Sequence, residues 1–141
     1  MTTHSARALT VPQPWASCIA HGTKRVLNRP QPTDYRGPIL IHAGHTTDHR
    51  AWNAPLARPF VRRPQPAAAI VSVAWLNDCH AYDGYCTLWS GRGLWHWRLT
   101  NVTPLPKPVP WSGTSDHLWL PPAPLLTNPR IVDALETTAR A

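Results

Sequence analysis

The stretch ALTVPQPWASCIAHG (residues 8–22) decides the fold of this chain, because it predicts a strand followed at once by a short helix. Residues 8–11 are mostly apolar and suit a strand. Pro14 suits the first turn of a helix, where its missing N–H costs no hydrogen bond, and Gly22 suits the residue just past the end. Trp15, Cys18 and Ile19 follow at spacings of three and four, so they share one helix face.

The rest of the chain alternates short strands with proline-rich segments. We expect an extended segment over 24–29 and strands over 37–43, 67–77 and 93–100, the last with the period-two pattern of a half-exposed strand. Residues 102–111 hold four prolines, so they are expected to be extended but to pair only at an edge. Short helices are expected over 47–53 and 128–141. These elements predict an α+β fold, a small mixed β-barrel with two or three short flanking helices.

Composition limits the class of protein. The 141 residues include 17 prolines and 8 tryptophans but only 1 phenylalanine. So many prolines exclude long helices, and therefore coiled coils and helix bundles. Most tryptophans are expected to fill the core, with Trp15, Trp75 and one of Trp95 or Trp97 as first choices. We expect one domain over residues 1–125 and a C-terminal helix or tail over 126–141.

The same composition indicates where the protein works. No stretch approaches the roughly 20 apolar residues that span a bilayer, and the first residues lack the apolar core of a secretory signal. Three cysteines do not make the paired framework of a secreted domain. We therefore expect a cytoplasmic protein with reduced thiols and no membrane partner, present as a monomer or weak dimer.

The charge of the chain points to an anionic partner. Lysine and arginine number 14 against 7 acidic residues, which gives a net charge of +7, and 12 of the 14 are arginine. Guanidinium groups bind phosphates with two hydrogen bonds and stack on rings, so RNA or a nucleotide-like ligand is the expected partner, and DNA is possible. The alternative is a basic surface that serves only solubility, since no run of basic residues exceeds two.

Several short motifs, taken in order, resemble one known family. They are Gln13-Pro14-Trp15-Ala16-Ser17, Gly22-Thr23-Lys24, Asn28-Arg29, Tyr35-Arg36-Gly37-Pro38, Ile41-His42-Ala43, Ala69-Ile70-Val71, Asp78-Cys79, Trp95-His96-Trp97, the prolines of 104–110, and Leu118-Trp119. Together they cover roughly residues 8–122 and resemble the ASCH domain, the activating signal cointegrator homology family.

The resemblance implies a PUA-like β-barrel that binds RNA or acts on components of nucleic acids. Some members are amidohydrolases that remove acyl groups from N-acylcytidines, and one branch is reported as a ribonuclease. This chain departs from the family pattern at Pro12, where many relatives carry arginine, and at Leu27, where they carry glutamate or a nucleophilic threonine. Because leucine can neither attack a carbonyl nor move a proton, binding is the first expectation and hydrolysis the alternative.

The resemblance to the ASCH family predicts a basic, tryptophan-lined cleft between the first helix and the barrel. The cations expected to contact an anion are Lys24, Arg29 and Arg36. The residues expected to orient the ligand or stack on a base are Gln13, Asn28, His42 and Trp111, with Trp52 as a second stacking candidate.

Four of these residues also have a structural interpretation. Lys24 would be a solvated lysine favoured by the dipole at the helix end, and Arg29 or Arg36 would form an internal ion pair. Asn28 would begin a turn. If the chain is an enzyme, the expected catalytic residues are Lys24 as base, with Asp78 or His42 assisting.

No metal or cofactor is expected. His42, His45 and His49 lie three and four residues apart, and Cys79-His80 precedes Cys86 by a few residues, but neither group has the paired spacing of a closed zinc site. A third possible function is a protein-interaction module that uses the proline-rich segments 55–66 and 102–111.

Overall fold

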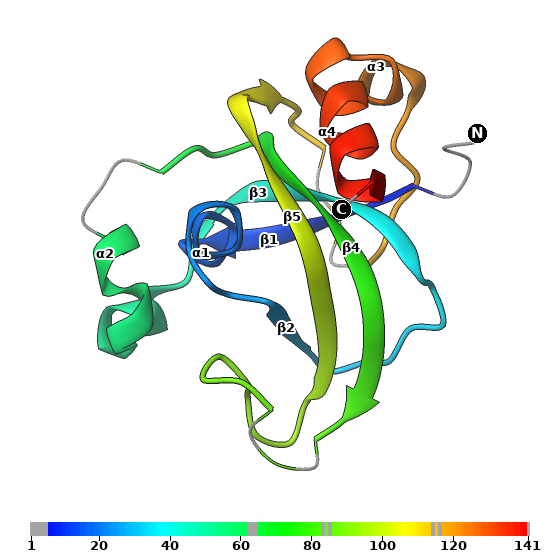
Figure 1. Cartoon of the computed structure of the whole chain (residues 1–141). Coiled ribbons are helices and arrows are strands. Elements are labelled where there is room, and N and C mark those ends of the chain that lie inside the picture. The colour runs from blue at the N-terminus through cyan, green and yellow to red at the C-terminus, as the bar shows by residue number, and fades with distance from the viewer. Residues whose placement is uncertain are drawn as a thin grey trace.

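The structure, a computed structural model, describes residues 6–61, 65–82, 84, 86–113, 115 and 117–140 (Figure 1). One strongly bent sheet of five strands organises the chain, in the order β1-β3-β4-β5-β2. β1 runs parallel to β3, and the other neighbours are antiparallel. The strands are β1 (Arg7–Gln13), β2 (Val26–Arg29), β3 (Gly37–Thr47), β4 (Ala69–Ala81) and β5 (Trp95–Pro110).

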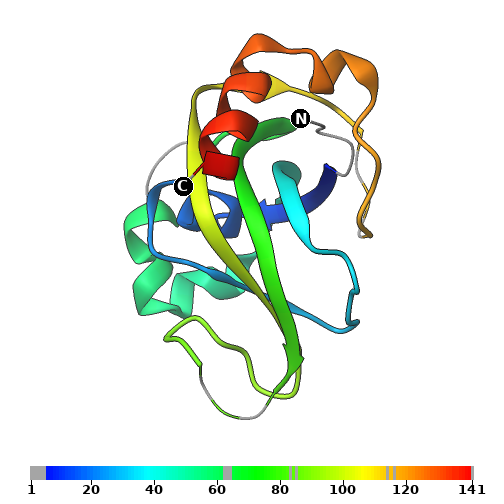
Figure 2. The same ribbon diagram turned by 45° about the vertical axis from the view of Figure 1, so that its right-hand side comes forward.

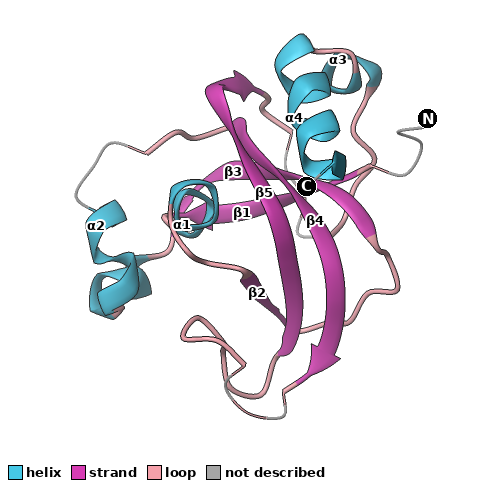
Figure 3. Cartoon of the chain, in the orientation of Figure 1, coloured by secondary structure: helices cyan, strands magenta, loops and turns pink. Residues whose placement is uncertain are grey.

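Short helices flank this sheet (Figure 3). The α-helices are α1 (Trp15–His21), α2 (Arg58–Val61), α3 (Ala123–Leu126) and α4 (Pro129–Arg140), and the 3-10 helices are η1 (His49–Asn53) and η2 (Pro55–Ala57). The expected α+β fold with short flanking helices is confirmed, and the strands of the expected small β-barrel form one strongly bent sheet. Among the described residues, none of these helices has the length and apolarity to cross a membrane.

Strand alternation gives the sheet two buried faces. Ile39 and Ile41 of β3 pack into a core with α1, whereas Leu40 between them packs into a second core with α4. All three are fully buried, which explains their continuous apolar run. Figure 2 shows α4 lying against β4 and β5. With both faces covered by helices, the sheet edges and the loops are the places where a ligand can reach the protein.

The segment from 93 to 111 forms one strand where we expected two. β5 continues from Trp95 to Pro110, and Asn101, with φ of 53°, marks the join of the two expected pieces. β2 pairs only with residues 95–98, so the proline-rich half of β5 pairs with β4 alone. The prolines therefore stand on an edge, as their missing N–H groups require.

The tryptophans divide between core and surface. Trp97 is 4% exposed and belongs to the first core, as expected for one of the pair 95 and 97. Trp15 is only half-buried and packs at the rim of that core. One face of Trp15 is therefore left to line a pocket.

Candidate ligand-binding pocket

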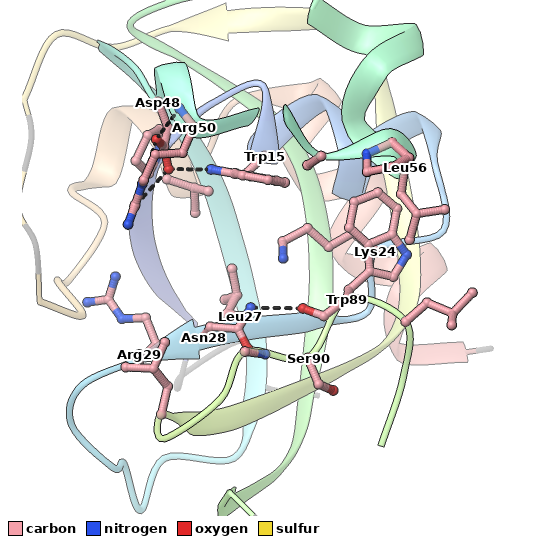
Figure 4. A pocket seen from close by; sticks show the side chains of 17 residues that line it. Trp15, Lys24, Leu27, Asn28, Arg29, Asp48, Arg50, Leu56, Trp89 and Ser90 are labelled. Atoms are coloured by element: carbon pink, nitrogen blue, oxygen red, sulfur yellow. Dashed lines mark hydrogen bonds and ion pairs between the residues drawn. The ribbon is translucent and has the colours of Figure 1, made fainter. Parts of the chain in front are cut away.

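A pocket of about 570 Å³ opens between the end of α1, strand β2, the η1–η2 segment and the loop after β4 (Figure 4). Its size suits a small organic ligand. The residues that line it and carry the argument below are Trp15, Lys24, Leu27, Asn28, Arg29, Asp48, Arg50, Leu56, Leu88, Trp89 and Gly91.

Lys24 is the buried cation of this pocket. It is 5% exposed, and its Nζ lies 5.1 Å from the ring centroid of Trp15 and 5.4 Å from that of Trp89. Burial lowers the pKa of Lys24 to about 8, an effect that the nearby Cys18 thiol only partly opposes. No carboxylate among the described residues forms an ion pair with it. Figure 4 shows the amino group directed into the open part of the pocket.

The neighbouring Arg25 lies against the backbone at the C-terminal end of α1. Its guanidinium donates to the carbonyls of Ile19, Gly22 and Lys24 at the C-terminal end of α1, at 3.0–3.2 Å. The Ile19 carbonyl belongs to the last turn of α1, where carbonyls have no partner within the helix, so the arginine helps to complete the helix end. The arginine is thereby committed to the backbone, and the adjacent lysine extends toward the two rings.

Asp48 fixes one wall of the pocket. It accepts a hydrogen bond from Nε1 of Trp15 at 2.8 Å and two from the Arg50 guanidinium at 2.9 Å. The hydrogen bonds from Arg50, and then that from Trp15, hold the pKa of Asp48 well below its usual value despite partial burial. The carboxylate is therefore ionised and holds the Trp15 ring in place.

Asn28 fixes the opposite wall. Its side-chain amide donates to the carbonyl of Trp89 at 2.9 Å and accepts from the N–H of Gly91 at 2.6 Å. A Cβ on Gly91 would lie 3.0 Å from the Asn28 side chain, so only glycine allows this approach without a shift. Trp89 also donates from Nε1 to Thr23. Asn28 therefore ties the loop that carries Trp89 to strand β2.

Arg29 connects the pocket to a second depression. It lines the first pocket and also one of about 590 Å³ bounded by Thr10, Gly44 and His45. Its guanidinium carbon lies 5.3 Å from the Trp97 ring centroid. A cation between two adjoining depressions is positioned to meet an extended anion.

Of the residues expected to form the site, the structure brings Lys24, Asn28 and Arg29 together in the pocket. Gln13 does not line it: this side chain is 3% exposed, accepts from the N–H of Ser17 in α1 and donates to the carbonyl of Pro66. Its role is to join the start of α1 to the segment before β4.

His42 and Trp111 lie together, away from the pocket lining. The fully buried His42 donates from Nε2 to the Trp111 carbonyl at 2.6 Å, so its Nδ1 accepts from the Thr10 hydroxyl at 3.0 Å. Burial lowers the pKa of His42 despite the hydrogen bond to Trp111. With both nitrogens bonded and the ring neutral, His42 serves the structure.

Arg36 and Asp78 also lie outside the pocket lining. Arg36 is exposed and donates to the carbonyls of Thr33 and Tyr35. Asp78 accepts from Nδ1 of His80 at 2.8 Å, and this hydrogen bond is the main reason that its pKa is lowered. We therefore do not include either residue in the proposed pocket.

The pocket contains residues that sequence reasoning missed. They are Asp48, Arg50, Leu56, Leu88 and Trp89, together with Trp15, which was expected in the core. Trp89 carried a signal: it lies among serine and glycine residues in a loop without strand periodicity. Loops lie on the surface and carry many of the residues that bind ligands, so this position favoured a surface role for Trp89.

Comparison with known proteins places the fold. No family model and no curated protein matches the sequence. Among solved structures, the chain is similar to a point mutant of the ZmASCH protein from Zymomonas mobilis, with a TM-score of 0.54 and 13% sequence identity over 94% of this chain and 97% of that one. At this identity the likeness shows the fold alone, and the fold of this chain is that of an ASCH protein.

Proposed function

We propose that this chain is an ASCH-type domain whose pocket binds a nucleotide unit, either free or within single-stranded RNA. One observation carries the proposal: a buried cation, Lys24, stands between two tryptophan rings without a carboxylate partner among the described residues. Removing a charge from water costs several kcal/mol unless it is paired. An anionic group of a ligand would supply the missing partner.

The lining also suits the flat, apolar part of a nucleotide. Trp15 and Trp89 offer aromatic faces, on which a stacked base is worth about 1–3 kcal/mol. Leu56 and Leu88, which also line the pocket, are 39% and 86% exposed, so apolar surface stands open to a ligand. Arg29 and Arg50 add guanidinium groups for phosphate oxygens. A second depression beyond Arg29 gives room for an adjacent nucleotide.

Tryptophan fluorescence tests this proposal directly. Titration at low salt with mononucleotides and with short single-stranded RNAs is expected to quench Trp15 and Trp89. Lys24→Met and Arg29→Gln should each weaken binding by about tenfold or more, the loss expected for a charged hydrogen bond. Arg140→Gln removes an equal charge from an exposed position on α4 and should bind like the parent. Absence of quenching by every ligand, or equal losses in all three variants, contradicts the proposal.

Hydrolysis is the second candidate, and the lowered pKa of Lys24 favours it. A lysine with a pKa of about 8 is partly neutral near physiological pH and is able to accept a proton from water. Leu27 lines the pocket beside it and provides no nucleophile, so water would have to attack. Incubation with an N-acylcytidine and with labelled RNA should then show turnover that Lys24→Met abolishes. Turnover no greater than in buffer rejects an enzyme while leaving binding intact.

A further inference from the structure

Two histidines and one cysteine lie close together at the end of the β4–β5 hairpin where the loop joins the two strands. His80 of β4 and His96 of β5 are direct cross-strand partners, with ring centroids 5.3 Å apart, and Cys86 belongs to the loop that connects the two strands. One side-chain ligand atom from each of the three lies within 4.8 Å of the others. None of the three lines the pocket described above.

The hydrogen bonds of His96 leave its Nδ1 available to bind a metal. His96 is fully buried, and its Nε2 lies 2.7 Å from the carbonyl of Gly91. A carbonyl only accepts, so Nε2 carries the proton and Nδ1 presents its lone pair. That Nδ1 faces Sγ of Cys86 at 3.5 Å. Two ligands of one tetrahedral zinc ion lie about 3.6 Å apart when one is sulfur and the other nitrogen.

His80 is prepared in the same way. Its Nδ1 bonds to the Asp78 carboxylate at 2.8 Å, which leaves Nε2 to act as a ligand. A carboxylate behind a histidine fixes the ring and raises the basicity of the metal-facing nitrogen, a recurrent arrangement in zinc sites. A ring nitrogen of His80 lies within 4.8 Å of Sγ of Cys86. Both histidines therefore have the outer hydrogen bonds of metal ligands.

We propose that His80, Cys86 and His96 bind a divalent cation of the zinc class. Two imidazoles and a thiolate suit zinc rather than magnesium or calcium, which prefer oxygen ligands. The cysteine gives up its thiol proton to solvent when the metal binds. Three protein ligands leave one tetrahedral position for water or for a ligand atom.

The site would act on the pocket through the loop between them. Gly91, whose carbonyl holds His96, lines the pocket, and so does Ser90, whose hydroxyl lies 3.1 Å from Sγ of Cys86. Trp89 lies next to both in the chain. A bound metal would therefore fix the loop that carries one of the two pocket rings.

Cobalt spectroscopy on the reduced protein tests the proposal. One equivalent of Co²⁺ is expected to produce the intense visible bands of a tetrahedral ion and a near-ultraviolet sulfur-to-cobalt charge-transfer band, and Zn²⁺ should displace both. Cys86→Ser should abolish the charge-transfer band. Asp78→Asn, which removes only the carboxylate behind His80, should weaken metal binding by about 10–100-fold. Cys79→Ala is the matched control and should keep the full spectrum.

The outcomes separate this site from the pocket. No tetrahedral spectrum with the parent protein, a charge-transfer band that survives in Cys86→Ser, or one that disappears in Cys79→Ala overturns the metal site. Circular dichroism shows whether each variant is folded. Because Lys24 is not a ligand, Lys24→Met should bind Co²⁺ like the parent whether or not the pocket binds nucleotides.

Discussion

Lys24 combines a cost in stability with a use in binding. The protein buries its ammonium group between two rings, and neither of the ion pairs among the described residues includes it. A buried charge that gains its partner only when a ligand binds is expected to destabilise the ligand-free protein. This opposition between stability and binding can be measured at one residue.

Replacement of Lys24 by methionine is expected to stabilise the ligand-free protein. The pKa of Lys24 falls from 10.5 in the unfolded chain to about 8 in the fold, so between these pH values the unfolded state binds the extra proton. The destabilising contribution of Lys24 to the parent protein therefore becomes smaller as the pH rises from 8 to 10.5. The advantage of Lys24→Met, about 3 kcal/mol at most, should be full below pH 8 and vanish toward pH 10.5. Urea unfolding at several pH values measures it.

The difference between the two proteins is the quantity to follow. Burial also raises the pKa of Cys18 to about 11 and that of Tyr35 to about 12, so both groups lower the stability of the protein at high pH. The effect of Tyr35 is the same in parent and variant, whereas the charge of Lys24 lowers the pKa of Cys18 in the parent only. Subtracting one unfolding curve from the other removes most of this shared effect. An advantage for Lys24→Met that stays constant from pH 7 to 10.5 would contradict a lowered lysine pKa.

At the scale of elements, Asn28 joins two segments that lie far apart in the chain. Asn28→Ala removes both hydrogen bonds to the loop around Trp89 and leaves the Gly91 N–H without its partner. The variant should lose about 1–3 kcal/mol of stability. Backbone amides of residues 87–91 should exchange hydrogen faster, and ligand binding should weaken with them. Hydrogen-exchange mass spectrometry and the fluorescence titration check both effects.

Asn77→Ala is the control for that loop. Asn77 is an exposed residue of β4, and its replacement should leave both the exchange of residues 87–91 and the binding unchanged. If Asn28→Ala exchanges like this control, the amide does not hold the loop.

Helix α4 is a second element whose contribution can be isolated. Ile131 is fully buried in the core that α4 forms with the sheet, whereas its neighbour Val132 is 37% exposed. Ile131→Ala should cost about 2–5 kcal/mol, and Val132→Ala within about 0.5 kcal/mol. Thermal unfolding of the two variants gives the comparison. Equal losses would mean that α4 is only loosely attached to the sheet.

Local signals in the sequence predicted most elements but few of the contacts that make the sites. The apolar runs located β3 and β4 to within a few residues, because strand periodicity is a local property. The hydrogen bonds of Asn28 join residues 61 and 63 positions apart, and no local pattern reports them. The same applies to His96 and Cys86, whose approach depends on the register of β4 against β5.

At the scale of the whole molecule, the packing of helices on both faces of the sheet explains where the two candidate sites lie. α1 closes one face and α4 the other, so the pocket and the histidine–cysteine cluster both lie where strands end and loops begin. The net charge of +7 is spread over a surface of 7711 Å². Such a net charge attracts any polyanion. Only the charged residues at the pocket distinguish a specific binding site from a generally basic surface.

Salt dependence separates these two contributions. Arg29→Gln and Arg140→Gln each lower the net charge from +7 to +6, so their long-range attraction for RNA is the same. If Arg29 neutralises a phosphate of a single-stranded RNA, its loss should reduce the magnitude of the slope of log K against log salt by about 0.7. The reason is that fewer counterions leave the RNA when the protein makes one phosphate contact fewer. Arg140→Gln should keep the parent slope. Equal slopes for the two variants would mean that RNA binds through overall charge, and the pocket would then have no part in its recognition.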